Sequence, residues 1–296
     1  MNGFLAALIL AGNSLACAVF LKTSHLRRSY MNIYLVSLAI SDMCMGALVM
    51  PFYSVFCTGC KYSLTQHCWL IRALKGVTFG ANILNLLAIS LDRHEAFFNS
   101  LRYISSMTKR RVAFILTAVW GLPLLATGTR NIWQHSESKE QALYIDKIYT
   151  NILTFIFVII PFFLLLAINF RILYVIKKQV QRIQAANSTN PHCRAVNNVR
   201  KVKGTLACVV AVLVYILCWL PRIFYNFCLL FRRADLVSPI LIHLSFFFLF
   251  LQSSLNPFIY SFYRVEFRQA AIRLLGCQNS SNDNISIVLV SSRKTK

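Results

Sequence analysis

Long runs of hydrophobic residues alternate with short polar segments along most of the chain. Each run is long enough to cross a hydrocarbon layer of about 30 Å, which takes about 20 helical residues. The runs are continuous, without the alternation of apolar and polar residues that is typical of membrane-spanning strands. We therefore predict an all-α membrane protein, a seven-transmembrane-helix bundle. The predicted spans cover approximately residues 2–21, 30–57, 66–92, 112–129, 148–176, 204–231 and 236–263.

The composition supports this class of protein. Of the 296 residues, 57% are hydrophobic and only 14% are charged, whereas a soluble globular domain carries roughly 25% charged residues. An ordinary soluble enzyme is therefore excluded. The net charge of +22 would suit a nucleic-acid partner only if it lay on one face of a soluble domain. Here the basic residues lie mostly between the apolar runs, so we expect no nucleic acid partner.

The positions of Lys and Arg also predict an orientation. They concentrate in the segments after the first, third and fifth spans and in the carboxyl-terminal tail. Because basic residues are retained on the cytoplasmic side, we expect a multi-pass plasma-membrane protein with an extracellular amino terminus and a cytoplasmic carboxyl terminus. No basic segment or small-residue cleavage site precedes the first run, so we expect a span there rather than a signal peptide. A longer amino terminus in the natural protein stays an alternative.

Residues 262–275 follow the last span and have the pattern of a short amphipathic helix. We expect such a helix to lie flat on the lipid of the inner leaflet. Cys277 comes directly after it and is a candidate for palmitoylation, with an unmodified cysteine as the equal alternative. We expect one transmembrane domain over residues 1–276 and a disordered cytoplasmic tail over residues 277–296.

Several polar residues fall inside the predicted spans. Asp42 lies in the middle of the second span, where a carboxylate costs several kcal/mol unless it is paired or hydrated. Asn82, Ser253 and Asn256 lie in other spans and carry polar atoms that could reach it. We predict that this group holds a sodium ion with water, and no other metal. The alternative is a neutral carboxylic acid that is hydrogen-bonded between helices.

The third span carries a cation at each end. Lys75 and Arg93 are eighteen residues apart, which is five helical turns, so they project from one face about 27 Å apart. Asp92 directly precedes Arg93. If this face is turned to the bundle, Lys75 lies near the outer opening and Arg93 near the inner one.

The sixth span contains Trp219 beside a predicted hinge. Pro221 removes one backbone hydrogen bond and permits a kink. Arg222 follows at once, too deep in the span to reach the outer surface easily. We therefore expect Arg222 to point into an aqueous pocket.

Catalytic motifs are missing from the sequence. The six His residues show no metal-ligand spacing, and the chain has no P-loop, GxGxxG or GxSxG pattern. The last span has no Lys that could hold retinal as a Schiff base. We predict that the protein is not an enzyme and needs no cofactor.

A set of short motifs occurs in a fixed order along nearly the whole chain. They are Gly12 with Asn13, LAISD ending at Asp42, Cys68, DRH at Asp92–His94, Trp120, Pro161, CWLP at Cys218–Pro221 and NPFIY at Asn256–Tyr260. In these motifs and their spacing the sequence resembles the class A, or rhodopsin-like, family of G-protein-coupled receptors. Its pattern looks most like the monoamine-like small-ligand branch of that family.

The resemblance implies a mechanism. An extracellular ligand would bind an outer pocket and shift a two-state bundle, and a heterotrimeric G protein would dock in the opened inner cleft. By matching position, Trp219 would be the packing switch, and Arg93, beside Asp92, would rearrange with Tyr260. The same positions would place the sodium on Asp42, Asn82 and Asn256. Arrestin and a receptor kinase are further partners that the resemblance implies.

Some residues depart from the family pattern. Lys201 stands where many relatives have an acid that pairs with the arginine, and Asn169 stands where most have a tyrosine. The loop over residues 129–147 lacks the cysteine that would pair with Cys68 in the family. A relative that does not couple, acting as a decoy or heterodimer partner, therefore stays an alternative. A transporter is a weaker one, because we see no internal repeat.

The ligand class follows from one substitution. The amine-binding branch has an Asp where this chain has Lys75, and a cation there would repel an ammonium group. With Arg222 nearby, an anionic ligand is the expected class. Pairing of Lys75 with an acid from an outer loop is the alternative. The apolar walls of the expected pocket are Phe79, Trp219, Phe246 and Phe250.

Overall fold

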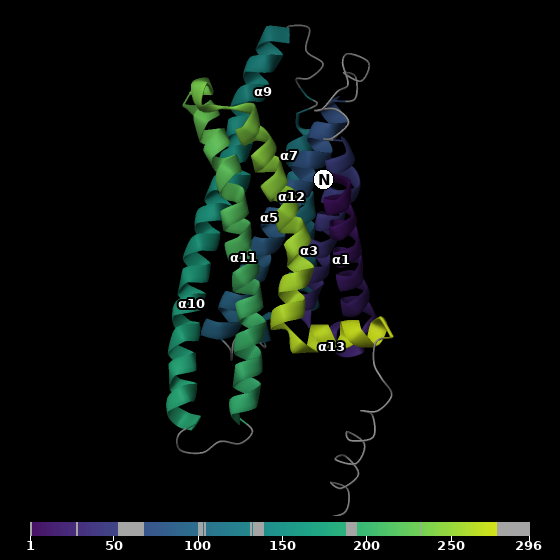
Figure 1. Ribbon diagram of the computed structural model, residues 1–296. Helices are drawn as coiled ribbons and strands as arrows, with labels where there is room; N and C mark the ends of the chain where they lie inside the picture. Colours follow the sequence, from purple (N-terminus) through teal and green to yellow (C-terminus); the bar gives the residue numbers. More distant parts are fainter. Residues whose placement is uncertain are drawn as a thin grey trace, which may run out of the picture.

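The computed structural model is a bundle of long helices that run up and down side by side (Figure 1). The residues that it describes are 2–27, 29–52, 68–99, 103, 105–130, 132, 139–187, 194–231 and 233–276. Within these ranges, seven helical segments are long and apolar enough to cross a membrane. The predicted fold class is confirmed.

The helices follow the chain in the order of the predicted spans. The first two spans are α1 (Asn2–Lys22) and α3 (Tyr30–Cys44), joined by the short α2 (Ser24–Arg27), and α3 continues through a π-helical turn, η1 (Met45–Val49). The next elements are α5 (Cys68–Phe98), α7 (Lys109–Gly128), α9 (Lys139–Thr154), a second π-helical turn η3 (Phe155–Ile159), α10 (Ile160–Asn187), α11 (Arg194–Leu230), the 3-10 turn η4 (Ala234–Leu236), α12 (Pro239–Tyr263) and α13 (Val265–Leu274).

Helix ends differ from the predicted span ends where a helix leaves the apolar layer. The fifth span is predicted to begin at residue 148, but the helix that forms it begins nine residues earlier, with α9. Hydrophobicity marks only the part of a helix that lies in lipid, and helical hydrogen bonds continue into polar sequence beyond it. The predicted end of the second span, residue 57, lies outside the described residues.

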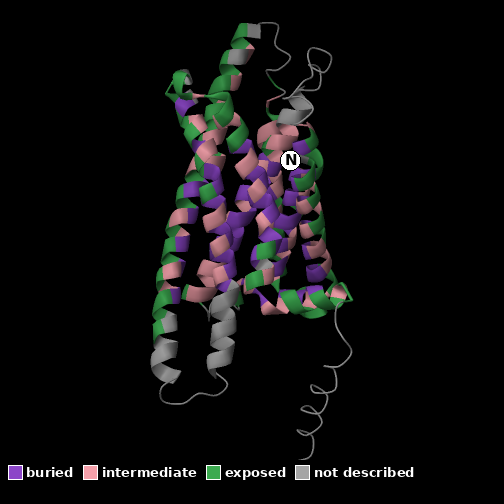
Figure 2. Cartoon of the chain, viewed as in Figure 1, coloured by how far each residue is buried: buried purple, intermediate pink, exposed green. Residues whose placement is uncertain are grey.

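Burial sorts the side chains into an inside and an outside. Buried residues gather along the axis of the bundle, and exposed ones cover its flanks (Figure 2). Large apolar side chains are among the most exposed, including Phe114, Leu125 and Phe163. Exposed apolar area on this scale fits a bundle whose solvent is lipid. Helix α5 contacts α3, α7, α10 and α11, so residues along it reach most of the interior.

Close packing of α5 on α7 depends on a glycine. A Cβ atom added at Gly80 would lie 2.8 Å from two ring carbons of Pro123. We expect Gly80→Ala to lower the melting temperature of the purified protein by about 3–8 °C, because overpacking a rigid contact costs about 1–3 kcal/mol. Gly121→Ala is the matched control, since a Cβ there meets nothing within 4 Å. Equal melting temperatures for the two variants would contradict this packing argument.

The amphipathic helix predicted over residues 262–275 is α13, and it crosses the end of the bundle (Figure 1). It begins at Val265 and not at residue 262, because α12 continues through Tyr263. Phe267 on its buried face packs against Phe20 of α1, with ring centroids 5.1 Å apart. In the turn before α13, Arg264 donates a 2.7 Å hydrogen bond to Asn32 Oδ1 of α3. These contacts fix α13 against the first two spans. Cys277 and the tail predicted over residues 277–296 lie outside the described residues.

Candidate ligand-binding and signalling sites

A buried polar cluster surrounds Asp42 in the middle of the bundle. Asn82 of α5 donates its Nδ2 to Asp42 Oδ1 at 2.6 Å, and Asn256 of α12 donates its Nδ2 to Asp42 Oδ2 at 2.7 Å. Asn13 of α1 donates to the backbone carbonyl of Ser253 at 3.1 Å. The structure therefore brings together four helices at the site for which the sequence predicts sodium.

Some oxygen atoms of this cluster lack a hydrogen-bond partner. The Oδ1 atoms of Asn82 and Asn256 are buried without a hydrogen-bond partner among the described residues, and the Oγ atom of Ser253 is buried beside them. Buried polar atoms usually have a partner in the protein, an ordered water or an ion. Together with the Asp42 carboxylate, these oxygens are the donor type that a hard cation prefers. The residues present thus fit a small monovalent cation with water.

Near the carboxyl-terminal end of α5, which the sequence predicts to face inward, Asp92 and Arg93 form an ion pair. Arg93 Nε lies 3.1 Å from Asp92 Oδ2, and a terminal guanidinium nitrogen also contacts this oxygen. Tyr103, in the segment after α5, donates its hydroxyl to Asp92 Oδ1 at 2.8 Å. Burial and the neighbouring Asp92 carboxylate raise the pKa of the Tyr103 hydroxyl, so Tyr103 stays a donor. Tyr103 was not predicted to be part of this site, because nothing in the sequence shows which loop residue folds back onto α5.

The other signalling residues are placed less completely. The side chains of Tyr260 and Lys201 lie outside the described part of the structure, although both residues belong to helices. Asn169 of α10 is buried and donates to Ser90 Oγ of α5 at 3.2 Å and to the Leu165 carbonyl at 2.8 Å. Asn169 therefore ties α10 to α5 by a short polar contact.

Trp219, the predicted switch residue, packs between α5 and α11. The Trp219 ring meets the Phe79 ring edge to face, with centroids 5.7 Å apart, and also contacts the Tyr215 ring at 5.3 Å. Pro221 lies two residues further along, inside α11. Trp219 thus joins α5 to α11 next to the predicted hinge.

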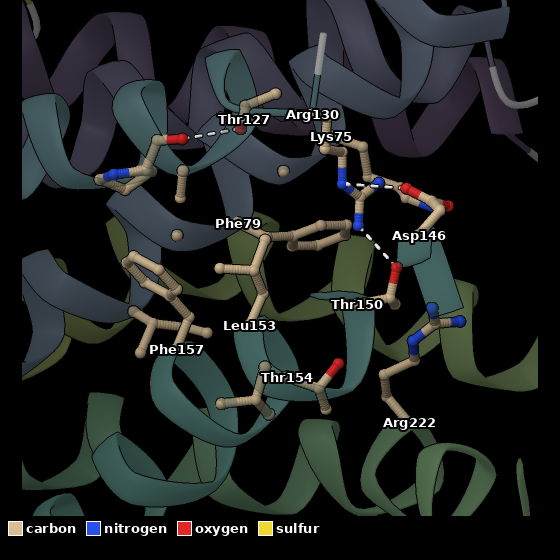
Figure 3. A pocket seen from close by; sticks show the side chains of 16 residues that line it. Lys75, Phe79, Thr127, Arg130, Asp146, Thr150, Leu153, Thr154, Phe157 and Arg222 are labelled. Atoms are coloured by element: carbon tan, nitrogen blue, oxygen red, sulfur yellow. Dashed lines mark hydrogen bonds and ion pairs between the residues drawn. The ribbon is translucent and has the colours of Figure 1, made fainter. Parts of the chain in front are cut away.

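A cavity of about 390 Å³ opens between α5, α7, α9, η3 and α11 (Figure 3). It lies at the end of the bundle that the sequence predicts to face outward, and we call it the outer cavity. Lys75, Phe79 and Arg222, three residues of the expected pocket, line it. The sixteen lining residues are Lys75, Gly76, Phe79, Gly80, Ile83, Pro123, Ala126, Thr127, Arg130, Asp146, Thr150, Leu153, Thr154, Phe157, Val158 and Arg222.

Three residues of the expected pocket, Trp219, Phe246 and Phe250, do not line this cavity. Trp219 is buried against Phe79, and Phe250 is buried and stacks on Phe246 with centroids 6.3 Å apart. Phe246 supports the lining from outside it, because the charged groups of Lys75 and Arg222 both lie over its ring. Contact of these three residues with a ligand stays a prediction.

A charged group that the sequence does not reveal lies at the rim of this cavity. Arg130, just after α7, lies with its Nε 3.6 Å from Asp146 Oδ1 and donates to Thr150 Oγ1 at 2.7 Å (Figure 3). Asp146 falls within the loop predicted over residues 129–147, whereas in the structure it lies on α9. The signal was the four-residue spacing of Asp146 and Thr150, which puts both on one face of a helix.

A seven-helix membrane bundle has a cavity at one end, a buried carboxylate at its centre and a charged pair at the opposite end. These features define a class, that of seven-helix membrane receptors. Comparison with known proteins places the chain within that class. Residues 12–260 match the family described as 7 transmembrane receptor (rhodopsin family). The chain belongs to this family.

Relatives in this family cover almost the whole chain. The D(1C) dopamine receptor of Xenopus laevis is 29% identical over 97% of this chain and 70% of its own length. The D(5)-like dopamine receptor of Takifugu rubripes is 31% identical over 90% of this chain and 64% of its own length. The human histamine H2 receptor is 28% identical over 95% of this chain and 80% of its own length.

Family membership decides the general function. The protein is a multi-pass membrane receptor that transduces the binding of an extracellular ligand into G-protein activation. It is a receptor and not an enzyme, as predicted from the sequence. The decoy and transporter alternatives are not favoured.

Proposed function

We propose that the receptor lies in the plasma membrane with its amino terminus outside, and that its ligand binds in the outer cavity. The orientation rests on the distribution of Lys and Arg along the sequence. One observation carries the ligand site: Phe79 lines the cavity and also packs edge to face on Trp219. A ligand that moves the Phe79 ring therefore acts on α11 two residues from Pro221. The Phe79–Trp219 contact alone therefore links the cavity to the predicted hinge at Pro221.

The inner end of the bundle converts this movement into signalling. Without ligand, Asp92 holds Arg93 against α5. A pivot of α11 at Pro221 opens the space beside Arg93, and the released guanidinium contacts the heterotrimeric G protein. Such a change needs only two packed states of the bundle, of which the ligand favours one. Tyr260 and membrane lipid around α13 belong to the same proposal, as do arrestin, a receptor kinase and palmitoylation of Cys277.

A sodium ion would be held by Asp42, Asn82, Ser253 and Asn256. When bound, it supplies positive charge that compensates the Asp42 carboxylate. The residues themselves fix α3, α5 and α12 to one another through the two amide hydrogen bonds on Asp42. The site therefore stabilises the arrangement of helices that exists before the ligand binds.

The ligand differs in class from those that the relatives' names mention. Dopamine and histamine are amines and carry a positive charge at neutral pH. Lys75 lines the cavity of this chain, and like charges that face one another in a site of low dielectric repel. We propose that this receptor does not take a simple monoamine.

The test of receptor function is nucleotide exchange. Membranes from cells that express the full chain should accelerate the binding of GTPγS to at least one class of Gα subunit, relative to membranes without the chain. Asp92→Asn, which removes the charge that holds Arg93, should raise the ligand-free rate about threefold or more, since hydrogen bonds to charged groups contribute about 1.5–3 kcal/mol. No acceleration by either protein on any Gα class would contradict the proposed coupling.

A further inference from the structure

A second cavity, of about 280 Å³, lies between α3, α5 and α7. Helix α5 lines it from Leu84 to Glu95, and α7 lines it from Arg111 to Leu122. The two residues of each pair are eleven positions apart, which is about 16 Å along a helix axis. The cavity is therefore elongated along the two helices, and we call it the α5–α7 groove. The described residues that line it are all different from those of the outer cavity.

The α5–α7 groove opens on the flank of the bundle that meets lipid. Leu91, Phe114 and Leu122 line the groove and are 46%, 75% and 51% exposed. All three belong to helices that are long and apolar enough to cross a membrane. Exposed apolar side chains inside a span face hydrocarbon. A molecule that is dissolved in the membrane therefore reaches the groove without passing through water.

The charged residues of the lining gather at one end of the groove. Helices α5 and α7 are joined by the short segment over residues 99–108, so they run in opposite directions. Asp92 and Glu95 near the end of α5 therefore lie at the same level as Arg111 near the start of α7. Toward Leu84 and Leu122 the described lining is apolar. The groove thus has the polarity of an amphipathic molecule.

Tyr34 of α3 supplies the observation that points to a ligand. Its side chain lines the groove and is fully buried, and its hydroxyl has no hydrogen-bond partner among the described residues. The guanidinium of Arg111 is close enough to interact electrostatically with this hydroxyl. Buried polar atoms nearly always have a hydrogen-bond partner. A polar group of a molecule in the groove would satisfy the Tyr34 hydroxyl.

We propose that the α5–α7 groove binds a single-chain membrane lipid with an uncharged hydroxyl headgroup. The alkyl chain lies along Leu87, Ala118 and Leu122, and the headgroup bonds to Tyr34. The volume of about 280 Å³ is just below the range of about 300–1,000 Å³ that holds drug-sized molecules, which suits one chain and not two. This site is independent of the ligand proposed for the outer cavity.

The charges at the end of the groove favour an uncharged headgroup. Asp92 is paired with Arg93, so Glu95 and Arg111 are the two further charges in the described lining, one of each sign. A charged headgroup would be attracted by one and repelled by the other, and it would also lose its own hydration. A hydroxyl can accept one hydrogen bond and donate another. We therefore expect the order alcohol before amine, carboxylate and alkane.

The experiment compares four probes that share one alkyl chain. These are 1-dodecanol, dodecylamine, dodecanoate and dodecane, each added at equal mole fraction to the full chain in phosphatidylcholine nanodiscs. We expect 1-dodecanol to raise the melting temperature by about 2–4 °C, at mole fractions about fivefold or more below those of the other three. Equal effects of the alcohol and the alkane, including no effect of either, would overturn the proposal. A preference for the amine or the carboxylate would also overturn it.

Variants separate the groove from a general effect of the probes on the bilayer. Ala118→Phe fills the groove and should abolish the effect of 1-dodecanol. Ala113→Phe is the matched control, because Ala113 is exposed on the same helix and does not line the groove. An effect of 1-dodecanol that survives in Ala118→Phe would place the alcohol elsewhere and overturn the proposal.

Tyr34→Phe tests the headgroup contact and keeps the ring that packs between the helices. We expect this variant to need about fivefold more 1-dodecanol for the same rise in melting temperature, since a neutral hydrogen bond contributes about 1 kcal/mol. The effect of dodecane should be unchanged. Equal responses of native protein and Tyr34→Phe to 1-dodecanol would overturn the assignment of the headgroup, even if Ala118→Phe fails to fold. The measurement needs no G protein, so its outcome is independent of the proposed coupling.

Discussion

Replacing Arg93 with alanine is expected to reduce G-protein activation at least about tenfold, to the level of membranes that lack the receptor. The guanidinium lies at the inner end of α5, bound to Asp92 and partly exposed. Once α11 moves, it is the group beside the opened space that can donate several hydrogen bonds to a partner. The loss of hydrogen bonds from one charged group costs about 1.5–3 kcal/mol, which corresponds to a tenfold or larger change.

The measurement is GTPγS binding at matched surface expression of native and variant receptors. Arg110→Ala is the matched control, because Arg110 is an exposed cation near the start of α7 with no part in the Asp92 ion pair. We expect this control to retain native activity. If Arg93→Ala retained more than half of the native rate, Arg93 would not be the contact that the proposal assigns to it.

The second large effect is expected at the central carboxylate. Asp42→Asn should abolish any dependence of the melting temperature on sodium, whereas the native protein should melt about 3 °C higher in sodium chloride than in N-methylglucamine chloride. A cation that binds only the folded state stabilises it by RT ln(1 + [L]/Kd), about 1.4 kcal/mol at ten times Kd. The variant keeps the size of the side chain and removes the charge that attracts the cation.

Asp235→Asn is the control for this measurement. Asp235 is an exposed carboxylate that pairs with Arg233, so its loss should leave the sodium dependence as in the native protein. A native protein that melts at the same temperature in both salts would favour the alternative of a neutral, hydrogen-bonded carboxylic acid at Asp42. A sodium effect that survives in Asp42→Asn would place the ion elsewhere.

The bundle was predictable because its signal is simple. Apolar runs of membrane length identify the spans, and a polar residue inside such a run is costly enough to mark an interior position. Asp42, Asn82 and Asn256 were grouped on that basis, and their side chains do meet in the structure. The pairing of Asp92 with Arg93 was also within reach, since the two are neighbours in the sequence.

The lining of the outer cavity was predictable only in part. The sequence indicates Lys75 and Arg222 because a cation inside a span costs free energy unless it is paired or hydrated. A phenylalanine inside a span has no such cost and can pack in many places. The sequence therefore does not show whether Phe246 and Phe250 contact a ligand or pack against other helices. That distinction depends on how α12 is oriented about its own axis, which only the structure gives. Asp146 was missed for a different reason, since α9 continues beyond the apolar run that predicted the fifth span.

The π-helical turn η3 sets the direction in which the side chains of α9 point. Such a turn holds one residue more than a regular helical turn, and each residue of a helix corresponds to a rotation of about 100°. With one residue fewer in Phe155–Ile159, α9 would turn by about that angle, and Asp146 and Thr150 would leave the cavity rim. The local register of these five apolar residues thus decides which polar groups of α9 a ligand meets at the cavity rim.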